Sequence, residues 1–138
     1  MAKTLALLDS SYLYALSDRD DKYHERARSF AREGTIEYVL PDVVLTEVTY
    51  SLRKLIGKHA EIAFLKTQAR FPIRRIGLEA DDLKRVHDIM SQYMQFDFVD
   101  CCIMALAERL NVGGVCTFDR RDFSLFKPSH CEYLELLP

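Results

Sequence analysis

Short apolar runs alternate with amphipathic segments along the whole chain. The runs suited to buried strands cover residues 3–8, 36–40, 73–77, 114–118 and 132–137. Helical spacing appears in between, from near Tyr12 and over residues 21–34, 43–57, 59–71, 79–94 and 98–111. Strands separated by helices pair in parallel, with helices on both faces. The pattern therefore predicts an α/β protein, a three-layer α/β/α sandwich around a mainly parallel sheet of four to five strands.

Two of these helices have a predicted core face. The expected stripe of the first consists of Leu45, Val48, Leu52, Leu55 and Ile56. That of the second consists of Val99, Ile103, Leu106 and Leu110. We expect Asp9 or a following serine to cap the helix near Tyr12, and Asp42 to cap the helix over 43–57.

Composition limits the function classes. The chain has 138 residues and is 49% apolar, which predicts a single domain over residues 1–138. Its formal charge of −2, with acids and bases interspersed, argues against a protein that binds polyanions by bulk charge. No apolar run approaches the roughly 20 residues that span a bilayer, so we expect a soluble cytoplasmic protein without membrane contact. The four cysteines lack zinc-site spacing, and Cys101 and Cys102 are expected to be small buried residues.

Two acidic residues follow predicted strands. Asp9 comes directly after the first run, and Asp119 almost directly after residues 114–118. Because parallel strands end at the same edge of a sheet, where ligands of such sheets bind, the two carboxylates are expected at one site.

Two further acids occupy informative helix positions. Asp100 lies in the opening turn of its helix, where the dipole is expected to favour the ionised carboxylate. Glu47 is the only charge between Val43 and Leu52, in a segment that is apolar nearly all round. Each acid alone is explained as a cap, a turn former or a boundary charge. Four converging carboxylates would repel one another unless a cation neutralised them, and all-oxygen ligation indicates Mg²⁺ or Mn²⁺. Such an ion can activate a water and stabilise charge on a phosphoryl group.

Four segments carry a resemblance that covers essentially the whole chain. They read LLDSSYLYALSDRDDKYHERA, LPDVVLTEVTYSL, FVDCCIMALAERL and VCTFDRRDF. In this order and spacing they resemble the PIN-domain nucleases, and most closely the VapC-type toxins of toxin–antitoxin pairs. The resemblance implies a PIN-like fold and a metal-dependent endoribonuclease that hydrolyses phosphodiester bonds, with structured RNA such as tRNA as substrate. It also implies a homodimer and a small antitoxin protein as partner.

The resemblance assigns the site residue by residue. The catalytic and metal-binding acids would be Asp9, Glu47, Asp100 and Asp119, with Thr117 and the hydroxyl of Ser10 or Ser11 as neighbours. Asp122 is either a fifth metal ligand or the cap of a short helix, and Asp97 is expected to be a helix cap.

Some basic and apolar residues could contact RNA or a protein partner, or could have no such role. Candidate phosphate contacts, which are equally well explained as solvated charges, are Arg53, Lys54, Lys58, Arg74, Arg75, Arg120 and Arg121. The two helices over residues 42–71 have surplus apolar residues, which belong either to a partner surface or to the ordinary core. They include Val43, Tyr50, Phe64 and Phe71.

Other functions fit the sequence less well. A catalytically inactive PIN-like scaffold that binds RNA or protein is the main alternative. Phosphoryl transfer of the haloacid dehalogenase type needs a second aspartate where this chain has Ser11, and the receiver type needs an acidic pair that residues 3–8 lack. No G-x-S-x-G elbow supports a serine hydrolase.

Overall fold

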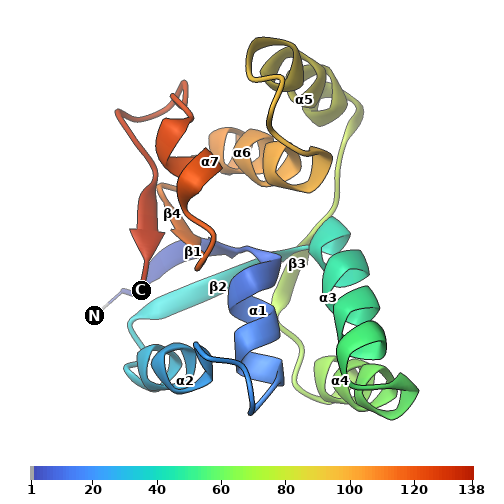
Figure 1. The fold of residues 1–138 in the computed structure, drawn as a ribbon. Coiled ribbons are helices and arrows are strands. Elements are labelled where there is room, and N and C mark those ends of the chain that lie inside the picture. Colours follow the sequence, from blue (N-terminus) through green and yellow to red (C-terminus); the bar gives the residue numbers. More distant parts are fainter. Residues whose placement is uncertain (1) are drawn as a thin grey trace.

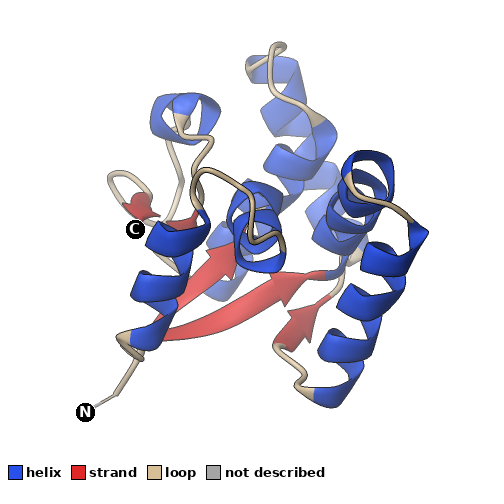
Figure 2. Ribbon diagram, turned by 60° about the horizontal axis from the view of Figure 1, so that its bottom comes forward, coloured by secondary structure: helices blue, strands red, loops and turns tan. Residues whose placement is uncertain are grey.

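The computed structural model describes residues 2–138 and contains one five-stranded sheet (Figures 1 and 2). Its strands are β1 (Thr4–Leu8), β2 (Ile36–Pro41), β3 (Arg74–Ile76), β4 (Gly114–Cys116) and β5 (Glu135–Leu137). They lie in the order β3-β2-β1-β4-β5, and every pairing is parallel. The predicted parallel sheet is therefore confirmed, including the short third strand.

Helices cover both faces of this sheet. They are α1 (Ser10–Ser17), α2 (His24–Arg32), α3 (Asp42–Leu55), α4 (Lys58–Arg70), α5 (Ala80–Gln92), α6 (Phe98–Leu110) and α7 (Arg121–Leu125). Figure 1 shows α1, α2 and α4 on one side of the sheet and α5 and α6 on the other. This is the expected three-layer sandwich. Within residues 2–138, no helix combines the length and the apolar character needed to cross a membrane.

The strand order places a switch point at the centre of the sheet. The chain proceeds outward from β1 through β2 to β3, then returns to add β4 and β5 on the opposite side of β1. β1 and β4 are therefore neighbours whose connections leave toward opposite faces, and the backbone N–H of Asp9 donates to the carbonyl of Cys116 at 3.0 Å. Ligands of open parallel sheets bind in the crevice that forms at such a point, beyond the carboxyl ends of the strands.

The core is centred on α6, which is buried on nearly all sides. Its residues from Asp100 to Ala107 are all buried, so the predicted stripe understates its burial. Cys101 and Cys102 are fully buried free thiols, as expected. Burial of this helix fixes its first turn, which carries Asp97 and Asp100, against the sheet.

Three local predictions are wrong. The buried face of α3 consists of Val44, Val48 and Leu52, a spacing of one residue per turn. Leu55 and Ile56, at the C-terminal end of the helix, are 68% and 43% exposed. α1 begins earlier than expected, with Asp9 at its N-cap position but with no capping bond from the Asp9 side chain. Asp42 is the first residue of α3 rather than its cap.

Candidate active site

The carboxylate of Asp9 lies at the switch point and is held by two hydroxyls. Asp9 is only 2% exposed. Ser11 Oγ and Thr117 Oγ1 both donate to Asp9 Oδ2, each at 2.7 Å. Because a buried carboxylate is costly without donors, these two bonds are what fixes the Asp9 side chain in this position. They engage one oxygen and leave Oδ1 free of hydroxyl donors.

The same hydroxyls connect the end of β1 to the loop after β4. Ser11 Oγ accepts the backbone N–H of Phe118 at 3.0 Å, and Thr117 Oγ1 accepts that of Asp119 at 2.9 Å. The predicted neighbours Ser11 and Thr117 thus lie beside Asp9. Ser10 takes a different position, in the cavity lining that it shares with Glu47.

Burial and neighbouring charge raise the pKa of Asp9. Removal from water is the larger cause, and the nearby charge of Asp119 acts in the same direction. The hydrogen bonds from Thr117 and Ser11 favour the ionised form but do not offset burial.

Asp100 is the most strongly perturbed acid with a defined value. Burial, followed by the charges of Asp9, Asp97, Asp119 and Glu47, raises its pKa from the ordinary 3.8 to about 8. The expectation that the helix dipole keeps Asp100 ionised is therefore wrong: desolvation and four like charges outweigh a dipole effect of about 1 kcal/mol. Asp97 is the predicted cap, since its Oδ1 accepts the backbone N–H of Asp100 at 3.0 Å.

Glu47 completes the group from α3. It is half-buried, and burial, with smaller contributions from the charges of Asp9 and Asp97, raises its pKa. The carboxylates of Asp9, Glu47, Asp100 and Asp119 are called here the acidic quartet. They come from four separate elements, yet the charges of the other three raise the pKa of Asp100, so the four lie close together.

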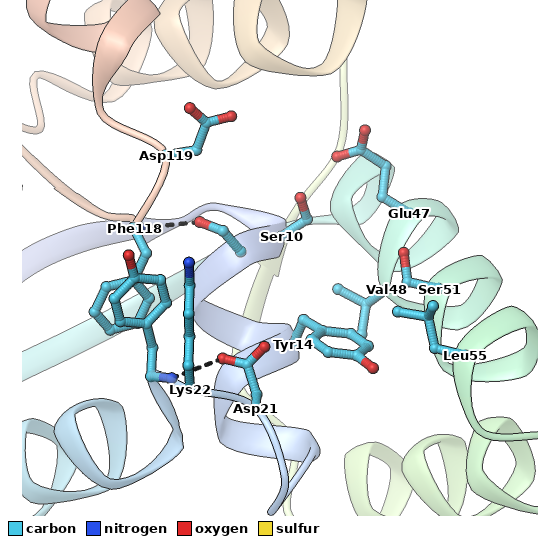
Figure 3. Close-up of a pocket in the computed structure, with 12 residues that line it drawn as sticks. Ser10, Tyr14, Asp21, Lys22, Glu47, Val48, Ser51, Leu55, Phe118 and Asp119 are labelled. Atoms are coloured by element: carbon cyan, nitrogen blue, oxygen red, sulfur yellow. Dashed lines mark hydrogen bonds between the residues drawn. The ribbon is translucent and has the colours of Figure 1, made fainter.

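A cavity of about 450 Å³ opens beside the acidic quartet (Figure 3). Glu47 and Asp119 line it from opposite sides, and Ser10 lies between them in the view of Figure 3, while Asp9 and Asp100 are themselves buried. The quartet thus has an open half that faces solvent and a buried half fixed to the sheet and to α6.

The donor chemistry fits a hard divalent cation. All four side chains offer carboxylate oxygens, and the quartet is stabilised by protons or by an added positive charge, since burial and mutual repulsion disfavour its ionised form. Within residues 2–138, no three acidic, histidine or cysteine side chains are already close enough to ligate one ion. Binding therefore requires side chains of the quartet to move, and exposed Asp119 and half-buried Glu47 are the least restrained.

Asp122 and the predicted basic contacts lie outside the cavity lining. Asp122 is the second residue of α7 and makes no capping bond; its buried Oδ1 finds no hydrogen-bond donor among residues 2–138 and lies 3.6 Å from Arg121 Nε. Arg120 donates to the carbonyl of Pro138. Arg53 and Lys54 are exposed, and their charged ends lie 5.8 and 5.7 Å from the centre of the Tyr50 ring. The cavity lining in the described chain contains none of these residues.

The cavity also contains residues that the sequence did not indicate. Lys22 and Tyr23, from the loop between α1 and α2, line it together with Phe118. The pattern places both in the first turn of a helix over residues 21–34, whereas the helix begins at His24. Their helical pattern carried no sign of a contact with the loop after β4.

A parallel α/β sandwich with an acidic cluster at its switch point defines the class of protein. Within that class, the family model of the PIN domain matches residues 6–127, and the chain belongs to this family. The resemblance noted in the sequence is thereby confirmed.

Individual relatives are distant but match over most of their length. The chain is 24% identical over 124 residues to Ribonuclease VapC26 of Mycobacterium tuberculosis, a match that covers 88% of this chain and 92% of the relative. Its structure is similar, with a TM-score of 0.80 and 19% identity, to VapC20 of the same organism, described as a toxin that cleaves the sarcin–ricin loop; the match covers 93% and 98% of the two chains. A toxin–antitoxin complex from Klebsiella pneumoniae matches with a TM-score of 0.63 and 18% identity, over 86% of this chain and 90% of that one.

Proposed function

We propose that the protein is a Mg²⁺- or Mn²⁺-dependent endoribonuclease whose catalytic residues are Asp9, Glu47, Asp100 and Asp119. The observation that carries the proposal is a buried carboxylate, Asp9, held by two hydroxyls at the switch point and surrounded by three further acids. Membership of the PIN domain family and similarity to a protein named as a ribonuclease support the same activity.

Each part of the site has a defined task in this proposal. The quartet would hold the divalent cation, which supplies charge stabilisation at the scissile phosphate and lowers the pKa of a water. Ser11 and Thr117 orient Asp9 by occupying Oδ2, and Oδ1 would remain available to hold the ion. The backbone bond from Asp119 N–H to Thr117 fixes the start of the loop that carries the fourth acid.

We infer that the substrate is structured RNA such as tRNA. The cavity at the quartet is open and large enough for part of a nucleotide. More distant phosphate contacts are proposed for four exposed basic residues, Arg53, Lys54, Arg120 and Arg121. Half-buried Asp122, whose Oδ1 atom is buried without a hydrogen-bond donor in the described chain, is proposed as a fifth acid that joins the site when the ion binds.

A cleavage assay tests the proposed activity. We expect the purified chain to cut RNA from a tRNA pool in Mg²⁺ or Mn²⁺, to leave 5′-phosphate ends, and to stop completely in EDTA. Activity should return when the ion is added back. Cleavage that persists in EDTA would contradict the proposed metal site. Mn²⁺ binding without cleavage of any RNA would favour the alternative of an inactive PIN-like scaffold.

We further propose that the chain is the toxin of a toxin–antitoxin pair and forms a homodimer. The support is the similarity to a chain of a toxin–antitoxin complex and an unusually apolar surface on α3 and α4. Its exposed members are Tyr50, Leu55, Ile62, Leu65 and Phe71, whereas Phe64 belongs to the core. Light scattering coupled to size exclusion should give twice the mass of one chain, and a monomer at micromolar concentration would contradict the dimer.

A further inference from the structure

A column of aromatic rings connects the loop between α1 and α2 to the acidic quartet. Phe118, one residue before Asp119, packs between two tyrosines. Its ring centre lies 4.4 Å from that of Tyr23 with the planes only 3° apart, and 5.9 Å from that of Tyr12. Stacked rings at these distances stabilise the contact beyond simple burial of apolar area. Tyr23 is therefore fixed relative to the loop that carries Asp119.

Lys22 is positioned by this column. Its Nζ lies 5.0 Å from the centre of the Tyr23 ring, a cation–π contact. The loop backbone is held as well, because Asp21 Oδ2 accepts the N–H of Tyr23 at 3.0 Å. In Figure 3 the Lys22 side chain runs from the loop into the cavity, on the side where Phe118 and Asp119 lie.

The charge of Lys22 has no ion-pair partner in the described part of the chain. None of the ion pairs found among residues 2–138 involves Lys22. Of the described residues that line the cavity, it is the only lysine or arginine, and the other charged groups of the lining are the carboxylates of Asp21, Glu47 and Asp119. An RNA strand that enters such a cavity meets repulsion from every other charged group, so a cation placed there has a clear electrostatic use.

We propose that Lys22 binds a phosphate of the RNA next to the one that is cut, and that Tyr23 and Phe118 hold its ammonium group at that place. The rings of Tyr23 and Phe118 support the lysine, since Phe118 stacks on Tyr23 and the Lys22 ammonium group lies 5.0 Å from the centre of the Tyr23 ring. The inference rests on the proposed nuclease function and adds a substrate subsite to it.

RNA binding by Lys22→Gln tests the inference. We would measure the affinity for a labelled single-stranded RNA and for tRNA in an Asp9→Asn background, which prevents cleavage, between about 50 and 200 mM salt. Lys22→Gln should weaken binding about tenfold at the lower salt concentration and reduce the slope of log affinity against log salt by about 0.7. Lys22→Arg should retain most of the affinity. With Asp9 restored, Lys22→Gln should raise KM more than it lowers kcat.

The matched control is Lys84→Gln, which removes the same charge from an exposed position on α5. We expect it to bind RNA like the parent protein. Tyr23→Leu, which keeps the lysine and removes its support, should weaken binding by less than Lys22→Gln, and Tyr23→Phe should not weaken it.

Each outcome separates the subsite from the nuclease. Equal RNA affinity of Lys22→Gln and Lys84→Gln would overturn the inference, whether or not the wild type cleaves. If Lys22→Gln leaves the RNA affinity unchanged and binds Mn²⁺ more tightly, Lys22 serves to neutralise the acids, and the inference is also overturned. Lys22-dependent binding without cleavage by the wild type would support the subsite and contradict the proposed function. A wild type that binds no RNA would contradict both.

Discussion

Replacement of Asp9 by asparagine is expected to reduce RNA cleavage by about 10²- to 10³-fold, the range found in other enzymes when a single group that stabilises transition-state charge is removed. The expected loss is this large because Asp9 is the buried centre of the acidic quartet and carries the charge that would face the ion. Divalent-ion binding should be lost together with cleavage.

The same substitution should not destabilise the fold. Both hydroxyl donors, from Ser11 and Thr117, reach the single oxygen Oδ2, and the amide oxygen of asparagine can take that place and accept both bonds. Burial raises the pKa of Asp9, so its ionised form opposes folding, and a neutral isostere removes this cost. The melting temperature of metal-free Asp9→Asn at pH 7 to 8 should equal or exceed that of the wild type.

Parallel measurement of cleavage, Mn²⁺ binding by calorimetry and thermal unfolding separates these effects. The control is Asp42→Asn, because Asp42 also follows a strand directly but is exposed, and its Oδ1 lies 3.8 Å from Arg75 Nε. We expect full cleavage from this control. Full cleavage by Asp9→Asn would remove the basis of the proposed active site, and a marked fall in its melting temperature would mean that the side chain serves the fold.

The sequence predicts those features of the site that local pattern and strand direction determine. Asp9 and Asp119 follow parallel strands, so the position of the strand ends alone brings them to one edge. Glu47 was indicated as the one charge in an apolar stretch, and Asp97 as a cap by its place before the helix at Phe98. These predictions depend on residues within a few positions of one another, where periodicity is informative.

Features that depend on packing between distant segments were not predictable. The contact of Tyr23 with Phe118 joins the loop after α1 to the loop after β4. The local sequence pattern of either loop gives no information about the other loop. The titration of Asp100 is of the same kind: its place in the helix predicts an ionised acid, whereas burial and four acids from other elements raise its pKa. The exposure of Leu55 was missed because a helical stripe does not reveal at which turn the helix loses contact with the core.

The pKa of about 8 at Asp100 predicts that the metal-free protein loses stability as pH rises. Between the ordinary value of 3.8 and about 8, the folded chain retains a proton on Asp100 that the unfolded chain has released. Because the unfolded state binds fewer protons in this window, the free energy of unfolding falls with increasing pH, by about 1.4 kcal/mol per pH unit at most for one group. The stabilisation is fully present below about pH 4 and is lost above about pH 8. Asp9 and Glu47, whose pKa values are also raised, contribute in the same direction.

A bound divalent ion should reverse this trend. The ion needs the ionised carboxylates, so its affinity should increase with pH until Asp100 is deprotonated, and its binding should release protons. Stabilisation by the ion should reach about 2.7 kcal/mol at a free concentration of one hundred times its dissociation constant. The largest increase in melting temperature on addition of Mg²⁺ is therefore expected near pH 8, and little increase near pH 5.

Thermal unfolding from pH 5 to pH 8.5, in EDTA and in Mg²⁺, measures both effects, with Asp100→Asn beside the wild type. The difference between the two proteins isolates Asp100 from the histidines, which titrate in the same range. In EDTA, Asp100→Asn should lose less stability than the wild type as pH rises, and Mg²⁺ should stabilise it little. If the two proteins instead show the same pH dependence in EDTA, Asp100 is not held protonated by its neighbours, and the acids do not form one coupled site. A further outcome is that the two proteins differ in EDTA as expected while Mg²⁺ fails to stabilise the wild type at pH 8. That result would support the coupling of the acids and contradict the proposed role of the ion.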